Sequence, residues 1–267
     1  MIRHVSLAAL AATLAASPAH AETQPPQQAA EAFVAKAEAD YEKAGIEAGQ
    51  ADWVYQTYTT QDTEAMTARA SAAATVVNVT TALGAARFAD VPGLTYDTAR
   101  KLNRMRTLIV LPAPTRPGAA GAVAMLTARM QGIYGKGQGT LLGKPINGSD
   151  IEAAMGTNRN PAELKEMWVS WHDNVGKPMR EDYTRLVALS NEGAKELGYA
   201  DVGALWRSNY DMSPEAFTAL TEKLWTEVKP LYDQLHCFTR ARLNERYGDE
   251  VQAKTGPIRA DLLGNMW

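Results

Sequence analysis

The sequence predicts an all-α protein, and three observations support this prediction. Aromatic residues make up only 7% of the 267 residues while alanine is abundant, a composition typical of helices. Apolar residues between Phe217 and Phe238 recur every three or four positions, which is the period of a helix. The segment Asn160-Pro161-Ala162-Glu163 is a compact helix-start signal, with asparagine as N-cap and proline at the first helical position. No segment shows the alternation of a half-buried strand, and no internal repeat is present.

The first 21 residues have the pattern of a secretory signal peptide. Arg3 and His4 form a short basic start, Val5 to Ala16 is apolar, and Ala19-His20-Ala21 fits a cleavage site. The apolar stretch is too short to span a bilayer, and no cysteine follows it that could be lipidated. We therefore expect residues 22–267 to be exported to a bacterial periplasm, with no membrane attachment after cleavage.

The first half of the mature chain reads as helices separated by turns. Thr59 or Thr60 can cap an Ala/Thr-rich helix. Asp62 and Glu64 would lie in its first turn, where negative charge is favourable for the helix dipole. Prolines between 112 and 117 prevent a helix from continuing there. The expected elements are a polar lead-in over 22–30, a helix over 30–44 ending at Gly45, an aromatic connector over 53–58, and helices over 60–88, 95–110 and 119–134.

The glycine-rich segment 135–148 is predicted to be a flexible surface loop. It lacks the Gly-Lys-Ser/Thr sequence of a phosphate-binding loop. Beyond it we expect helices over 161–175, where Gly176 ends the helix, over 179–197, from Asp201, and over 214–247 with a kink at Pro230. The last helix carries a continuous apolar stripe that is expected to face a core, formed by Phe217, Leu220, Leu224, Val228, Leu231, Leu235 and Phe238.

Charge and cysteine content exclude several classes of protein. The chain has 27 basic and 30 acidic residues, a formal charge of −3, so no basic surface for nucleic acid is indicated. Cys237 is the single cysteine, and no internal disulfide can form. Its place in the middle of a helix favours a buried structural thiol, with pairing to another segment or chain as the alternative.

The residues alone indicate little catalytic chemistry. The mature chain has two histidines, His172 and His236, far apart in sequence and each interpreted as a hydrogen-bonded structural residue. There is no His-Glu-x-x-His sequence, cysteine cluster or nucleophile elbow, and no spacing provides three metal ligands. Tyr210, taken alone, is a packing tyrosine.

Three sequence blocks stand out together. They are Trp168-Val169-Ser170-Trp171-His172-Asp173, Trp206-Arg207-Ser208-Asn209-Tyr210, and Leu231 through Gly256-Pro257-Ile258 to Leu262-Leu263-Gly264-Asn265-Met266-Trp267. In their order and approximate spacing, these blocks resemble the angiotensin-converting-enzyme family of zinc peptidyl-dipeptidases. The earlier segments 111–114 and 134–137 also resemble bacterial members.

The resemblance implies an almost wholly helical enzyme with a central channel that releases dipeptides from the C-terminus of oligopeptides. In such enzymes a zinc ion is bound by the histidines of His-Glu-x-x-His and a later glutamate. The glutamate of the motif activates a zinc-bound water for attack on the peptide carbonyl. Because that motif is absent here, we expect the chain to be the N-terminal part, lid and channel wall, with the zinc ligands beyond Trp267. The apolar Leu262, Leu263, Met266 and Trp267 are expected to need a surface to pack against.

One binding residue follows from the resemblance. Tyr210 matches a tyrosine that helps to bind chloride in chloride-activated members, together with an arginine from the later half. His172 stands where members with two chlorides have an arginine, so a first chloride site is not indicated here. Relatives often carry a cysteine pair after residues 134–137, and this chain has none there, so packing alone is expected to hold that loop.

Two other interpretations remain open. The chain could be a stand-alone periplasmic helical protein that binds peptides without catalysis, or an inactive truncated remnant. A helical structural protein unrelated to peptidases would leave the tryptophan-containing blocks unexplained.

Overall fold

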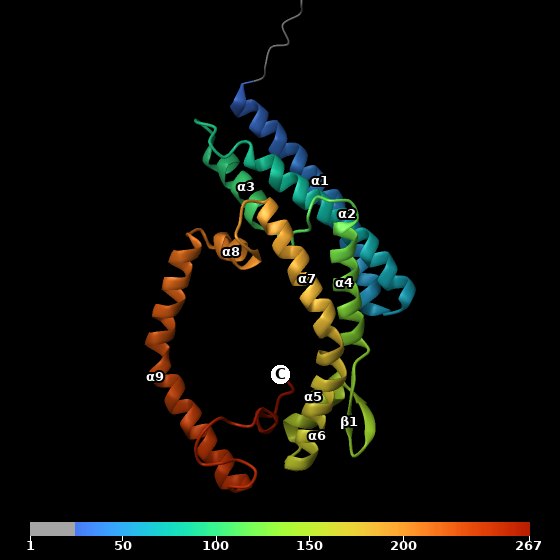
Figure 1. Cartoon of the computed structure of the whole chain (residues 1–267), viewed down its shortest axis with the longest axis vertical. Helices are drawn as coiled ribbons and strands as arrows, with labels where there is room; N and C mark the ends of the chain where they lie inside the picture. The colour runs from blue at the N-terminus through green and yellow to red at the C-terminus, as the bar shows by residue number, and fades with distance from the viewer. Residues whose placement is uncertain (1–24) are drawn as a thin grey trace, which may run out of the picture.

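The computed structural model describes residues 25–267, so the predicted signal peptide lies outside the described residues. The prediction of an all-α protein is confirmed, with one short hairpin added (Figure 1). The helices are α1 (Pro26–Thr57), α2 (Gln61–Ala86), α3 (Tyr96–Thr107), α4 (Ala119–Gly135), α5 (Gly148–Thr157), α6 (Pro161–Trp171), α7 (Lys177–Glu196), α8 (Val202–Arg207) and α9 (Pro214–Tyr247). The strands are β1 (Gln138–Leu141) and β2 (Lys144–Asn147), and shorter helical turns are η1 (His172–Gly176), η2 (Ser208–Tyr210) and η3 (Ala260–Leu263).

Helices α1, α2 and α3 form one packed layer at one end of the molecule. Contrary to expectation, α1 continues through Gly45 and takes in most of the predicted aromatic connector, because a glycine in a helix costs only about 1 kcal/mol. The Thr60 cap is confirmed: its side chain accepts from the Thr63 backbone N–H, and Thr63 reciprocates. The apolar centre of this layer is formed by Ala30, Val34, Ala37, Ala85, Leu102 and Met105.

The prediction of a flexible loop over 135–148 is wrong. Strands β1 and β2 pair antiparallel there, and Leu142 and Gly143 form the two-residue turn with φ of 53° and 72°. The Glu166 carboxylate accepts hydrogen bonds from both turn amides at 3.0 and 2.9 Å, and the Ser170 hydroxyl accepts from Thr140 N at 2.8 Å. Hydrogen bonds to α6 therefore hold the hairpin, in addition to packing.

We predict that Glu166→Ala loosens this turn without unfolding the helices. The two turn amides lower the pKa of the Glu166 carboxyl, the Gly143 amide most strongly. The carboxylate therefore favours the closed turn at neutral pH, and this contribution is lost as the pH falls through the lowered pKa. Amide exchange at Leu142 and Gly143 is expected to be about tenfold faster in the variant. Glu181→Ala on α7 is the control, and equal exchange in both variants would contradict the role of Glu166.

The expected break at Gly176 is also absent. Gly176 has helical dihedral angles, and the chain passes from α6 through the wide turn η1 directly into α7. The cap at Asn160 is confirmed, since its side chain accepts from the Ala162 N–H. Glu163 does not reach back to the backbone, but accepts from the side-chain amides of Asn158 and Asn160. The largest core lies along this helix and comprises Ile151, Met155, Leu164, Met167, Trp171, Val175, Leu262 and Met266.

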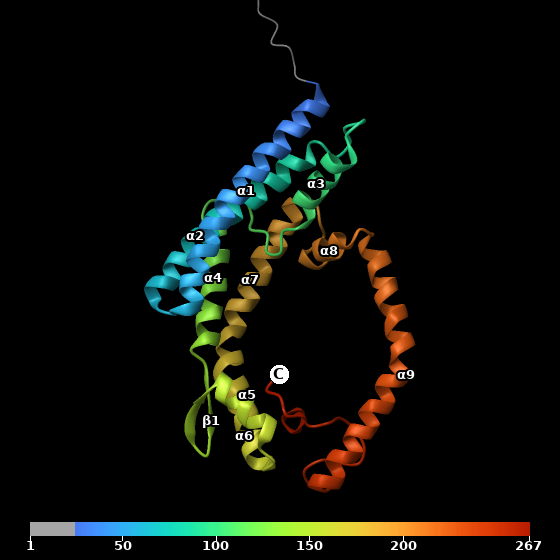
Figure 2. The same cartoon turned by 180° about the vertical axis from the view of Figure 1, so that it is seen from behind.

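Helix α9 stands opposite α7 across the molecule in both views (Figures 1 and 2). It begins at Pro214 and includes Pro230, as predicted, and Ser213 caps it, yet none of its residues is buried. The prediction that its apolar stripe faces a core is therefore wrong for the described residues; Leu231, for example, is 69% exposed. Cys237 is exposed for the same reason, which corrects the prediction of a buried thiol.

The C-terminal segment packs against α5 and α6. Leu262 and Met266 are buried, as their apolar character predicted, whereas Leu263 and Trp267 remain more than half exposed. The Trp267 ring stacks on Tyr134 with 5.8 Å between ring centroids. Within residues 25–267, no helix combines the length and the apolar character that crossing a membrane would require.

Candidate functional site

Tyr210 ends the turn η2, which links α8 to the start of α9. Its side chain is 57% exposed, and its ring stacks on Phe217 with 4.2 Å between centroids. A cavity of about 290 Å³ opens beside it, between this turn and the segment that follows α3. Trp206 lines the same cavity and donates its indole N–H to the Val110 carbonyl at 2.7 Å.

Helix α3 holds the residues on either side of Tyr210. The Arg100 guanidinium donates to both oxygens of Asp211, at 2.5 and 3.1 Å. Arg104 donates to the side-chain and backbone oxygens of Asn209, at 2.5 and 3.2 Å. Asp211 has a φ of 57°, a conformation that non-glycine residues adopt at some cost. Two arginines one helical turn apart therefore fix the backbone that presents Tyr210.

We predict that this contact weakens in acid. Hydrogen bonds from Arg100 hold the pKa of the Asp211 carboxyl below its ordinary value. Because the pKa is lowered in the folded state, the contact stabilises the chain above the ordinary carboxyl pKa and is lost as the pH falls through the lowered one. Carboxyl-carbon NMR of Asp211 should show the pKa rising toward its ordinary value in Arg100→Gln, while Arg104 still lowers it in part, and no rise in the control Arg106→Gln. An unchanged pKa in Arg100→Gln would contradict the assignment.

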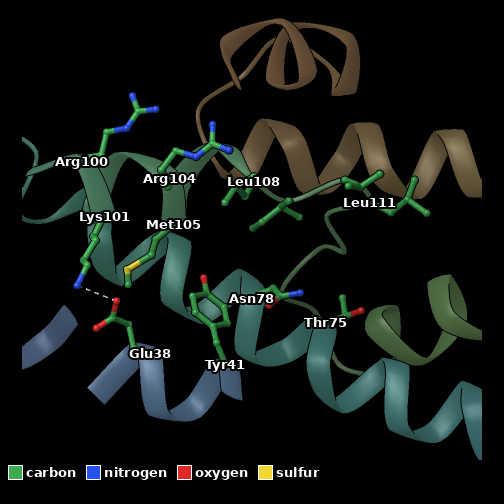
Figure 3. A pocket seen from close by; sticks show the side chains of 12 residues that line it. Glu38, Tyr41, Thr75, Asn78, Arg100, Lys101, Arg104, Met105, Leu108 and Leu111 are labelled. Carbon is green, nitrogen blue, oxygen red and sulfur yellow. Dashed lines mark ion pairs between the residues drawn. The ribbon is translucent and has the colours of Figure 1, made fainter. Parts of the chain in front are cut away.

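A second and larger cavity, of about 560 Å³, lies between α1, α2, α3 and the segment after α3 (Figure 3). Its wall is mostly apolar, formed by Met105, Leu108, Ile109 and Leu111 among others. Arg100, Lys101 and Arg104 line its α3 side, and Glu38 is the one carboxylate of the lining.

Two of these three cations have carboxylate partners. Lys101 lies 3.0 Å from Glu38 across the cavity, the contact dashed in Figure 3, and 3.2 Å from Asp97. Arg100 pairs with Asp211. Arg104 is half-buried and contacts only the neutral oxygens of Asn209. The cavity thus has one cation without a directly bonded counter-charge.

Polar groups from α1 and α2 complete the cavity lining. The Tyr41 hydroxyl points away from α1 toward the cavity in Figure 3, and burial raises its pKa, a shift that a hydrogen bond with Thr81 opposes. Asn78 and Thr75 line the cavity from α2.

The two histidines are hydrogen-bonded, as the sequence indicated. The Nδ1 of His172 lies 2.7 Å from the Trp168 carbonyl oxygen, and the two rings stack at 3.9 Å. Arg240 donates to the Nδ1 of His236 at 3.4 Å. Trp168 Nε1 is buried without a hydrogen-bond partner. His172 belongs to η1 and His236 to α9, which stand on opposite sides of the molecule.

No metal site is formed by the described part of the chain. Across residues 25–267, no three side chains of histidine, cysteine, aspartate or glutamate come together as ligands. The residues that the structure describes do not fit a catalytic zinc, which needs three protein ligands and an open position. No arginine lines the cavity beside Tyr210.

Sequence reasoning found Tyr210 but neither the α3 contacts around it nor the larger cavity. Arg100 and Arg104 are four residues apart, so they lie on the same face of α3. This spacing is the one feature of the sequence that could have indicated that the two arginines act together. Their partners are more than 100 residues away, however, and only the folded chain brings them together.

The described chain is all-α, and contacts from α3 fix the turn that carries Tyr210. The family model described as angiotensin-converting enzyme matches residues 24–267, and the chain belongs to this family. An angiotensin-converting enzyme of Haematobia irritans exigua is 40% identical over 118 residues, 44% of this chain and 19% of that relative. The enzyme of Mesocricetus auratus is 44% identical over 118 residues, 44% of this chain and 9% of the relative. The enzyme of Oryctolagus cuniculus is 38% identical over 146 residues, 53% of this chain and 11% of the relative. The matched segments thus span a fifth or less of these relatives.

Proposed function

We propose that the chain is the N-terminal part of an exported zinc peptidyl-dipeptidase that releases dipeptides from the C-terminus of oligopeptides. The observation that carries this proposal is the family match, which extends over residues 24–267. The pattern of residues 1–21 supports export to the periplasm. Residues 22–267 are proposed to be one structural part, lid and channel wall, of a single larger peptidase domain.

The proposed zinc chemistry requires residues that this chain does not contain. The sequence has no His-Glu-x-x-His, and the described residues form no cluster of three ligands. We place the zinc ligands and the catalytic glutamate in a segment beyond Trp267. The exposed stripe of α9 supports this division, because such a continuous apolar face is typical of a surface that packs against another element.

Tyr210 is the proposed chloride ligand. Its hydroxyl can donate a hydrogen bond to an anion, and Arg100 and Arg104 fix its backbone on both sides. A second donor or cation from the remainder of the enzyme would complete the site. Tyr210→Phe in the complete enzyme should abolish any chloride dependence of peptide cleavage, while the fold stays intact.

The coding DNA after the codon for Trp267 tests the proposal directly. An open frame that continues into a His-Glu-x-x-His helix would support it, and the complete product should then cleave dipeptides from an oligopeptide in a zinc-dependent manner. A stop codon at that point would overturn the catalytic proposal and leave a peptide-binding protein or an inactive remnant. Residues 22–267 alone are expected to show no zinc-dependent peptidase activity.

A further inference from the structure

The cavity between α1, α2 and α3 has the features of a ligand site that the proposed peptidase reaction does not use. Its volume of about 560 Å³ falls in the range of small-molecule sites in proteins. Such sites combine an apolar wall with a few convergent polar groups. Here Met105, Leu108, Ile109 and Leu111 provide the apolar wall.

Hydrogen-bond donors reach this cavity from three different helices. Tyr41 comes from α1, Asn78 from α2 and Arg104 from α3. Figure 3 shows Arg104 on the side of the cavity opposite Tyr41. Asn78 is half-buried and lines the cavity from α2. Arg104 can therefore meet an acceptor on the α3 side of the cavity, while Tyr41 and Asn78 line it from α1 and α2.

The lining favours an anion, because it holds three cations and one carboxylate. Glu38 is neutralised by Lys101 at 3.0 Å, and the charge of Arg100 is taken up by Asp211. Arg104 hydrogen-bonds only to the neutral Asn209, while its charge also acts on the nearby Asp211. A half-buried guanidinium in such surroundings binds a carboxylate more strongly than a neutral group.

We propose that this cavity binds a small amphipathic carboxylate, with the apolar body against Met105, Leu108 and Leu111 and the carboxylate at Arg104. A fatty acid and the C-terminus of a short apolar peptide share this chemistry. The site does not depend on the peptidase proposal, because no zinc ligand and no part of Tyr210 lies in it.

The experiment follows the methionine methyl groups of the full chain by NMR during titration with two probes. Sodium decanoate represents a lipid-derived carboxylate, and N-acetyl-leucyl-leucine represents a peptide-derived one. The Met105 methyl lines the cavity and is expected to shift, whereas Met125, which is 63% exposed on α4, is the internal control for adsorption to exposed apolar surfaces. We expect a dissociation constant of about 1 mM or tighter for at least one probe. The probe that binds identifies the source of the ligand.

Variants separate the carboxylate site from simple apolar binding. Arg104→Gln should weaken binding about tenfold or more, because it removes a charged hydrogen-bond donor. Arg106→Gln, on the same helix but outside the cavity lining, should bind as the unmodified chain does. Arg104 also holds Asn209, so Leu108→Asp in the cavity wall serves as a second variant that leaves this contact intact, and it too should weaken binding because it places a carboxylate in the cavity.

The proposal is overturned by any of three results. The first is the absence of a Met105 shift with both probes. The second is equal binding of N-acetyl-leucyl-leucine and its uncharged amide, N-acetyl-leucyl-leucinamide. The third is equal affinity in Arg104→Gln, Leu108→Asp and Arg106→Gln, all three of which would first be shown to retain the helical circular dichroism of the unmodified chain.

Discussion

Gly193→Ala is expected to destabilise the chain by about 3 kcal/mol, because the added methyl group has no space. Gly193 lies in α7 directly against the segment after α3. A Cβ atom there would lie 2.5 Å from the Pro112 carbonyl oxygen and 2.7 Å from its carbon. Both are backbone atoms of a proline-rich segment, which cannot move aside as the end of a flexible side chain can. The urea midpoint of unfolding measures the loss.

Gly45→Ala is the matched control for this prediction. Gly45 also lies within a helix, but no atom lies within 4 Å of the position its Cβ would occupy. Alanine there should stabilise the chain by about 0.5–1 kcal/mol through helix propensity alone. Equal urea midpoints for the two variants would show that α7 does not pack against residues 112 and 113 as described.

The helix starts were predictable from the sequence because capping is local. Thr60, Asn160 and Ser213 each accept a hydrogen bond from a backbone N–H two or three residues ahead, so the signal and its partner lie in the same short segment. Helix ends were predicted less well. Glycine was interpreted as a stop at Gly45 and Gly176, yet both lie within continuous helical backbone because flanking residues outweigh a cost of about 1 kcal/mol.

The hairpin and the two cavities could not be predicted from their own segments, because contacts with distant parts of the chain form them. Leucine at Leu142 is unusual in a turn that needs a positive φ, and this turn is held by Glu166 from α6. The cavity donors come from three helices, and no periodicity in one helix predicts which faces meet. Tyr210 was found only through resemblance, since a tyrosine on a short turn carries no signal of its own.

The apolar stripe of α9 shows most clearly what periodicity can and cannot establish. The repeat of three and four correctly predicted a helix of 34 residues. It also predicted that one side of the helix is apolar, but it cannot identify what covers that side. In the described chain nothing buries it, and Leu235 and Phe238 are both 59% exposed.

A pair of alanine substitutions tests this difference between α6 and α9. Met167 in α6 is fully buried within the largest core, so Met167→Ala should cost about 2–5 kcal/mol of the free energy of unfolding. Leu231 in α9 is apolar and of similar size but 69% exposed, so Leu231→Ala should change that free energy by less than about 0.5 kcal/mol. Urea unfolding of both variants of residues 22–267 gives the comparison.

The same pair distinguishes what covers α9. If Leu231→Ala costs as much as Met167→Ala in residues 22–267, then α9 is already buried in solution, by a second copy or by rearrangement, and the exposed α9 described here is wrong. If it costs little there but several kcal/mol in a longer product that continues past Trp267, the additional segment packs on the stripe. That result would support the proposed division of the peptidase independently of any catalytic assay, because it depends on burial and not on zinc.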